Sequence, residues 1–405
     1  MSFKDILATP GVIATLFTLF MVAFGFGVIL PILPFYALAH GAKPAELGML
    51  TATFAAMSLL FSPLMGKLAD RWGRKRILLI GTAGFAFGYL LFAATNSLEM
   101  AFVGRAIEGI SAAAIFPACL SLLADFTTEA QRSRAMNMVS MAFSLGLIMG
   151  PAFGGLAAGI SVQAAFLLSA VMAAINFLCV WRFVQEPPAK PSGRDIVAQE
   201  AGLLSHLASP LLFLFMGTFM VAFMFGGLDA TLALFTSERM GFGSAQIGLL
   251  FTYIGVLVLL MQFAGDYLIS KYGELVSIPA GLALSGSGFL LLAFTHDWLT
   301  ILIPIAIFIS GNALVFPSVN SLISKKVGGK RGGVMGLVSS FQSSGQLVGP
   351  LVGGALYGID HRYPFLAMAA VILSYALFFV LFARPKLKGV PDSKSDAGEA
   401  MAAVH

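Results

Sequence analysis

About twelve stretches of mostly apolar residues, each close to 20 residues long, follow one another along the chain, and they constrain its fold more than any other feature. Such a stretch is long enough to cross the hydrocarbon core of a membrane. Backbone groups in lipid need partners within the protein, which favours helices over the shorter, alternating strands of a barrel. We therefore expect an all-α polytopic membrane protein. The expected spans are 11–34, 46–66, 77–95, 99–123, 135–159, 163–184, 211–235, 246–265, 275–295, 298–323, 334–358 and 364–383.

Composition and charge support this reading. Hydrophobic residues make up 58% of the chain and charged residues 11%, whereas soluble domains carry about 25% charged residues. About 20 of the 24 Lys and Arg residues fall on segments that are cytoplasmic if the N-terminus is cytoplasmic. The net charge of +5 therefore indicates orientation, with both termini in the cytoplasm, rather than binding to nucleic acid. The basic residues on these segments include Arg71, Arg74, Lys75, Arg76, Lys325 and Lys326.

An internal repeat divides the chain into two similar halves. The segment Phe20–Phe24 recurs as Phe219–Phe223, and the pair Phe116–Pro117 recurs as Phe316–Pro317. Six spans per repeat is an even number, so the halves should share one membrane orientation. A polar segment with several prolines separates them. We expect a six-helix bundle at 1–185, a cytoplasmic linker at 186–209, a second six-helix bundle at 210–384 and a cytoplasmic tail at 385–405.

The segment from Gly66 to Arg76, GKLADRWGRKR, joins the second and third expected spans. Its basic residues should keep it in the cytoplasm. Gly66 would allow close helix approach, and Gly73 suits a tight turn. Asp70 is a lone acid that could pair with Arg71 or a neighbouring arginine, or face a helix N-terminus. The alternative is an ordinary basic loop.

This segment resembles the loop signature of the major facilitator superfamily, which implies the twelve-helix major facilitator fold. In that family the acid caps a helix of the other half, and the arginines pair with an acid at the end of the fourth span, where Asp125 stands here. The second-half equivalent, Ser270–Gly273, lacks the acid, so we expect an asymmetric gate. The implied cytoplasmic gate comprises Gly66, Asp70, Arg71, Gly73, Arg74 and Asp125.

Two further elements resemble the same superfamily. The fourth span carries Arg105 and Glu108 in an element similar to R-x-x-Q-G, with Glu108 in place of glutamine. The fifth span resembles the glycine-proline element of the superfamily's drug/proton antiporters, which implies antiport. An ordinary packing face of small residues is the alternative. This antiporter motif comprises Gly146, Gly150, Pro151, Gly154 and Gly155.

Three charged residues lie well inside expected spans: Arg105, Glu108 and Asp229. A charge within a membrane is costly and indicates function by default. Arg105 and Glu108 stand three residues apart, so they share a helix face and can pair. We expect the two acids to carry a coupling proton and Arg105 to tune them. The alternatives are a structural ion-pair network and a permanently wet vestibule.

By resemblance to the family, spans one, four, seven and ten would line a central cavity. Methionine and phenylalanine walls suit varied hydrophobic ligands, although such residues are equally common facing lipid. The expected cavity residues are Met21, Phe24, Phe26, Phe116, Phe223, Met224, Phe225, Asn312, Gln342 and Gln346.

Together these features favour a proton-coupled antiporter that exports small hydrophobic or amphipathic compounds by alternating access. It would act as a monomer in the bacterial inner membrane. Gly66 and Lys67 lack the glycine of a phosphate loop, so the proton gradient rather than ATP would supply energy. We expect no cofactor, no metal site and no enzymatic activity. The alternatives are a dedicated exporter of one sugar, organic acid, siderophore or lipid, and a membrane sensor that transports nothing.

Overall fold

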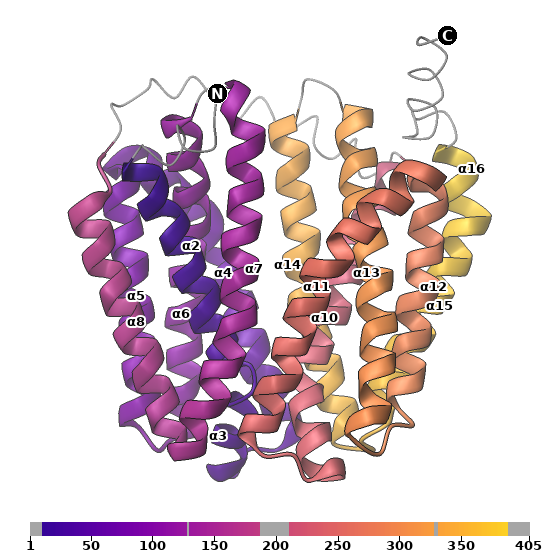
Figure 1. The fold of residues 1–405 in the computed structure, drawn as a ribbon, viewed down its shortest axis with the longest axis horizontal. Coiled ribbons are helices and arrows are strands. Elements are labelled where there is room, and N and C mark those ends of the chain that lie inside the picture. The colour runs from indigo at the N-terminus through magenta and orange to yellow at the C-terminus, as the bar shows by residue number, and fades with distance from the viewer. Residues whose placement is uncertain (1–9, 128, 187–209, 328–330, 388–405) are drawn as a thin grey trace. The chain divides into compact units, whose positions relative to one another are not determined.

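The computed structural model describes residues 10–127, 129–186, 210–327 and 331–387, and within these residues all regular structure is helical (Figure 1). The first half contains α2 (Pro10–Ile29), α3 (Leu33–Ala39), α4 (Pro44–Trp72), α5 (Arg74–Ala94), α6 (Leu98–Phe126), α7 (Glu129–Ile160) and α8 (Val162–Phe183). The second half contains α10 (Leu211–Met240), α11 (Ser244–Tyr272), α12 (Glu274–Leu292), α13 (Trp298–Val327), α14 (Arg331–Tyr357) and α15 (Tyr363–Phe378). A π-helical turn, η1 (Phe379–Ala383), joins α15 to α16 (Arg384–Leu387).

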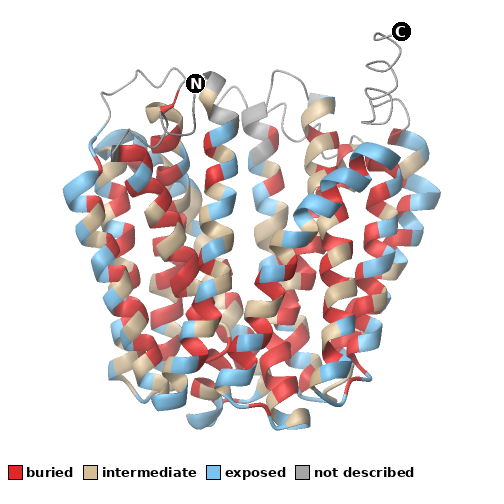
Figure 2. Cartoon of the chain, in the orientation of Figure 1, coloured by how far each residue is buried: buried red, intermediate tan, exposed pale blue. Residues whose placement is uncertain are grey.

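Every expected span overlaps one of these helices, and the first and the last each extend into a second element. Within the described residues, 11 helices are long and apolar enough to cross a membrane. The twelfth long helix, α14, is not among them because it is rich in glycine, serine and glutamine. Large apolar side chains such as Leu60, Leu156, Phe263 and Leu299 are exposed, as expected for a surface solvated by lipid. Exposed residues recur along many of the helices (Figure 2). The prediction of an all-helical protein with many membrane spans is confirmed.

The first span differs from its expected bounds. We expected a helix to residue 34, but α2 ends at Ile29 and a separate short helix, α3, begins at Leu33. Pro31 explains the break, because proline lacks an N–H donor and disfavours helical geometry in the residue before it. The equivalent helix of the second half, α10, has no such proline and continues unbroken to Met240.

The internal repeat extends to the helix boundaries. Helix α4 begins at Pro44 and α11 begins at Ser244, 200 positions later, and each spans 29 residues. Each is followed by a glycine with positive φ, Gly73 at 96° and Gly273 at 82°, a conformation that glycine adopts without strain. The two sequence halves therefore repeat these helices and the glycine turn that follows each of them.

Two compact units emerge from the packing. Unit 1 comprises residues 1–192 and 232–255, and unit 2 comprises residues 193–231 and 256–405. The expected linker, 186–209, lies outside the described residues except for Glu186. Residues 232–255 group with unit 1 because the start of α11 packs closely on α7. The boundary between the units therefore crosses α10 and α11.

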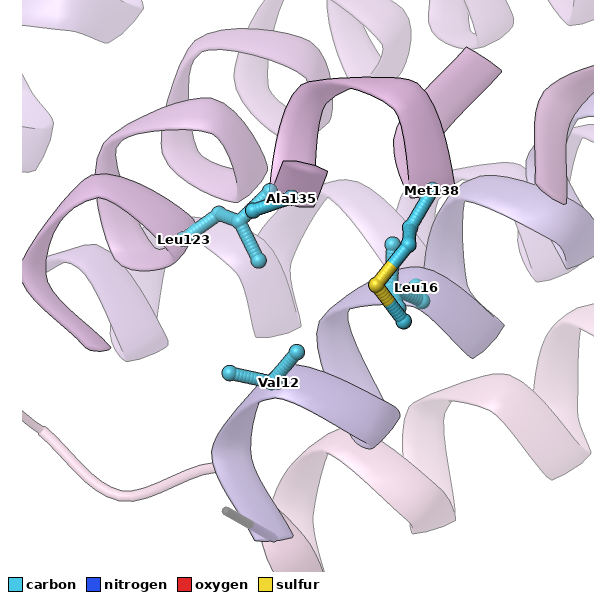
Figure 3. Close-up of a cluster of buried hydrophobic side chains, with 5 residues drawn as sticks. All are labelled: Val12, Leu16, Leu123, Ala135 and Met138. Atoms are coloured by element: carbon cyan, nitrogen blue, oxygen red, sulfur yellow. The ribbon is translucent and has the colours of Figure 1, made fainter. Parts of the chain in front are cut away.

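Apolar packing holds the helices of unit 1 together at the predicted cytoplasmic end. Val12 and Leu16 of α2, Leu123 of α6, and Ala135 and Met138 of α7 form one buried cluster (Figure 3). None of them is more than 9% exposed. Contacts of this kind fix α2, α6 and α7 to one another.

Candidate functional site

A buried ion pair lies inside unit 1. Arg105 Nη1 donates a hydrogen bond to Glu108 Oε2 at 2.7 Å, and only 3% and 1% of the two side chains are exposed. Both residues stand on α6, one turn apart, so the helix itself sets their spacing. Arg105 also places its guanidinium 4.7 Å from the centre of the Phe54 ring and donates from Nε to the Leu50 carbonyl at 3.4 Å. Helix α4 therefore covers the arginine.

Glu108 is enclosed from the other side by α5. A Cβ atom at Gly88 would lie 3.0 Å from Glu108 Cγ, so the glycine leaves the space that the acid occupies. Glu108 Oε1 is buried and accepts no hydrogen bond from any described residue. A sealed carboxylate with one satisfied and one unsatisfied oxygen has a vacant position for a proton. We call Phe54, Arg105, Glu108 and Gly88 the charged cluster.

A small pocket with polar and apolar lining residues adjoins the charged cluster, between α2, α5 and α8, since its lining residue Tyr89 directly follows Gly88. Asn176 is 2% exposed, and its Oδ1 accepts no hydrogen bond within the described part of the chain. Met21, an expected cavity residue, therefore faces a polar pocket inside the first half. The lining residues are Met21, Val22, Thr82, Phe85, Tyr89, Ala173 and Asn176.

The remaining expected cavity residues of the first half pack against their own unit. Phe26 lies 5.7 Å from the Phe54 ring, beside the charged cluster. Phe24 lies 5.8 Å from Phe153 of α7. Phe116 lies 5.7 Å from another α7 ring, that of Phe143. Of these three aromatic residues, the structure thus places Phe26 nearest to the buried charges.

In unit 2 the expected cavity residues vary in burial. Phe225 contacts Phe308 at 5.3 Å, and Asn312 donates to the Phe308 carbonyl at 3.3 Å. Phe223 is 5% exposed and Met224 is fully buried. The others are Gln342, which is half-buried, and Gln346, which is exposed.

Asp229, the third expected intramembrane charge, lies on α10 in unit 2 and is half-buried. The two expected coupling acids thus belong to different units. Whether Asp229 carries a proton stays a prediction.

The expected cytoplasmic gate segment is helical for most of its length. Helix α4 continues through Asp70 and Arg71, which are exposed, and ends only at Trp72. The expected loop is therefore a single turn at Gly73. Gly66 was expected to permit close helix approach, but a Cβ there would meet no described atom within 4 Å.

An ion pair joins two of the expected gate residues. Arg74, the first residue of α5, pairs with Asp125 near the end of α6. The side chains are 21% and 10% exposed. This pair fastens the predicted cytoplasmic ends of α5 and α6 to each other. Its function as a gate stays a prediction.

Glu186 completes this arrangement and was not identified from the sequence. Its carboxylate accepts the backbone N–H groups of Arg74 at 2.7 Å and of Lys75 at 2.9 Å. These are unsatisfied donors of the α5 N-terminus, where a negative charge is favourable. Lys75 Nζ donates to the Trp181 carbonyl at 2.9 Å. The only signal in the sequence is an acid placed directly before Pro187, after the sixth span.

The antiporter motif packs α7 against α2. A Cβ at Gly146 would lie 2.5 Å from the Phe20 carbonyl oxygen, and one at Gly154 would lie 2.6 Å from that of Val28. Gly150 makes the same kind of approach, and Pro151 lies against Gly27. Larger residues at these positions would separate the two helices.

Gly155, the last residue of the motif, faces a different helix. A Cβ there would lie 2.6 Å from the Ser244 carbonyl oxygen of α11, and one at Gly248 would lie 2.5 Å from the Pro151 carbonyl oxygen. Thr252 of α11 donates to the Ile148 carbonyl at 3.2 Å. The motif therefore packs α7 on two helices at once, α2 and α11.

Comparison with known proteins places the chain in a family. Residues 15–329 and 214–403 match the model of the Major Facilitator Superfamily. Multidrug resistance protein 1 of Bacillus subtilis is 31% identical over 91% of this chain and 96% of its own length. The class D tetracycline resistance protein of Salmonella ordonez is 34% identical over 78% of this chain and 81% of its own.

Solved structures of other transporters have the same fold. The crystal structure of a human organic anion transporter matches with a TM-score of 0.64 and 24% identity, covering 91% of this chain and 98% of that one. A transporter of the POT family matches with a TM-score of 0.76 and 16% identity, covering 93% and 96%. The chain is a multi-pass membrane protein that belongs to the Major Facilitator Superfamily.

Proposed function

We propose that this protein exports small hydrophobic or amphipathic compounds in exchange for protons, by alternating access. The observation that carries the proposal is the sealed Arg105–Glu108 pair, because Glu108 Oε1 has no hydrogen-bond partner among the described residues. A proton on Glu108 cancels the carboxylate charge and leaves Arg105 unpaired, so loading and unloading change the electrostatics of the site. Coupling requires that proton binding favour one conformation of the protein over another, and a change of charge inside the protein can do so.

The names of relatives support the substrate class. Two similar proteins are named for multidrug resistance and tetracycline resistance. Both names refer to resistance to drugs. Phe54, which belongs to the charged cluster, and Phe26, which packs against it, would offer aromatic faces to such compounds. The protein would thus be a transporter rather than an enzyme, and would work as a monomer in the bacterial cytoplasmic membrane with both termini in the cytoplasm.

The coupling step would run through the charged cluster and Asp229. Glu108 would accept a proton while it is accessible from outside and release it after the protein alternates. Arg105 would hold the carboxylate in place and favour its ionised form. Asp229 would take the same part in the second half, on α10.

The gate would consist of the Arg74–Asp125 pair together with Asp70 and Arg71, which are exposed at the end of α4. An exposed acid at the end of a basic segment is available to bind and release partners as the protein alternates. Asp70→Asn should therefore slow alternation but leave ligand binding intact.

Transport in proteoliposomes with an imposed proton gradient tests the proposal. Uptake of a panel of hydrophobic cations, neutral drugs and single metabolites should depend on the gradient and include several unrelated drugs. Glu108→Gln and Asp229→Asn should abolish gradient-driven transport, and at least one should retain exchange of substrate without a gradient. Full gradient-driven transport by both single variants and the double variant would refute the coupling role. Transport of one metabolite alone would favour a dedicated exporter, and transport of nothing would favour a sensor.

A further inference from the structure

A second ion pair lies at the predicted cytoplasmic end of the other half. Glu274 is the first residue of α12 and is fully buried. Its Oε1 accepts from Lys325 Nζ at 3.0 Å and from Ser321 Oγ at 2.7 Å, both on α13. Such a carboxylate is strongly held, because breaking a buried ion pair by removing one charged partner is strongly destabilising. We call Glu274, Ser321 and Lys325 the second clasp, and the Arg74–Asp125 pair of the first half is the first.

The repeat relates this clasp to the gate pair of the first half. Glu274 stands 200 positions after Arg74, and Lys325 stands 200 positions after Asp125. Each position therefore keeps a charge but reverses its sign. In both pairs the acid is the more buried partner, since Asp125 is 10% and Glu274 0% exposed while Arg74 and Lys325 are 21% and 24% exposed.

The two halves also supply negative charge differently to the N-terminus of the first helix of each pair. In the first half, the Glu186 carboxylate accepts the backbone N–H groups of Arg74 and Lys75 at the start of α5. In the second half, Glu274 itself places a carboxylate at the start of α12, where the helix dipole favours a negative charge.

The rest of the α12–α13 interface shows what the clasp adds. Close contacts between backbones fix these helices further along, at Gly281 against the Gly311 carbonyl oxygen and at Gly288 against Phe308 N. The ion pair acts beyond these contacts, at the helix ends. It therefore holds the ends in register without determining how the helices pack along their length.

We propose that Glu274 and Lys325 are positioning residues for transport, a counterpart of the Arg74–Asp125 pair with reversed polarity. The second half has no acid at Ser270, the position equivalent to Asp70. It nevertheless retains a clasp between α12 and α13, the helices equivalent to α5 and α6. The clasp keeps the ends of α12 and α13 together while the protein alternates. This inference rests on the proposed transport function.

The first experiment compares Glu274→Gln with Arg74→Gln, the substitution at the equivalent position of the first half, in proteoliposomes. Each should lower the maximum rate about tenfold and leave the apparent affinity for drug unchanged, because the clasp does not touch the substrate. A purely structural role would instead lower the thermal unfolding temperature and the amount of active protein without this split. An unchanged rate in Glu274→Gln would overturn the proposal.

Charge reversal gives the decisive comparison. The double variant Glu274→Arg with Lys325→Asp restores an ion pair with the polarity of the first half. The double variant should transport faster than Glu274→Gln. Equal inactivity of the double variant and Glu274→Gln would overturn the proposal.

One readout does not depend on transport. A cysteine introduced at Lys271, which is exposed at the end of α11, is labelled with a maleimide in wild type and in the milder variant Ser321→Ala. Labelling should change with drug in the wild type and less in the variant. If wild-type protein exports no drug but Glu274→Gln still lowers the unfolding temperature more than Arg74→Gln, the proposed function fails while the clasp remains a structural device. If wild type exports drug and Ser321→Ala and Glu274→Gln both behave as wild type, the clasp alone fails.

Discussion

Equivalent positions in the two halves of the chain carry charged side chains in the first half and apolar side chains in the second. In the first half, Arg105 and Glu108 form a buried ion pair on α6. The residues 200 positions later, Ile305 and Phe308, are both fully buried on α13. The neighbouring glycine is the same in each half: Gly88 lies against Glu108, as Gly288 does against Phe308.

This difference indicates why the charges are present. Replacing a buried ion pair by well-packed apolar residues is often neutral or stabilising, because burial of two charges costs free energy that their attraction repays only in part. The second half shows that this fold can pack the position with isoleucine and phenylalanine. The Arg105–Glu108 pair is therefore not needed to hold two helices together, which favours a role in transport.

The largest effect should come from breaking the pair on one side. Arg105→Ile introduces the second-half residue but leaves the Glu108 carboxylate buried without its donor. We expect a loss of about 3–5 kcal/mol in unfolding free energy and no measurable transport. Thermal unfolding in detergent and drug uptake in proteoliposomes measure the two effects. The matched control, Ile305→Val, should cost only about 1 kcal/mol; a similar loss in both variants would contradict the argument.

Introducing both second-half residues should separate stability from function. Arg105→Ile combined with Glu108→Phe removes both charges and their desolvation cost. We expect unfolding within about 2 kcal/mol of wild type, together with complete loss of gradient-driven transport. A double variant as unstable as Arg105→Ile alone would show that the first half cannot use the packing of the second. Transport at the wild-type rate would show that the charges are not required.

A smaller change isolates the proton. Glu108→Gln keeps the shape of the side chain and one acceptor for Arg105, but it cannot ionise. Drug exchange without a gradient should persist, while the dependence of uptake on external pH should disappear. Uptake measured from about pH 6 to 8 with a fixed drug gradient provides the check. A pH profile like that of the wild type would assign the coupling proton to another group.

Much of the fold followed from the sequence. Apolar runs long enough to cross a membrane located the helices, and the structure adds that the repeat extends to the bounds of α4 and α11, which are 29 residues long each. Boundaries were less predictable, since charged Asp70 and Arg71 extend α4 beyond its apolar part. Hydropathy detects where lipid begins, whereas backbone hydrogen bonds continue until a residue such as Gly73 ends the helix.

The site was less accessible to prediction. The spacing of Arg105 and Glu108 predicted their pairing because it depends on one helix alone. Contacts between helices depend on rotation about each axis, which hydropathy does not determine. The contacts of Glu186 with α5 and of Glu274 with α13 therefore emerged only from the structure. The missing acid at Ser270 gave no indication of the second clasp, because Glu274 and Lys325 carry the charges of Arg74 and Asp125 with reversed sign.

The smallest expected effect concerns the aromatic ring over the arginine. Phe54 lies 4.7 Å from the Arg105 guanidinium, and the residue 200 positions later is Ile254, beside a position without charge. Phe54→Ile therefore replaces the ring over Arg105 by the residue that stands at the equivalent position of the second half. Loss of the cation–π interaction should cost about 1–2 kcal/mol, because the pair is desolvated. Thermal unfolding measures this cost. Repeating the substitution in the Arg105→Ile background should remove the difference, since the ring then faces no cation; an equal cost in both backgrounds would mean that Phe54 contributes through packing alone.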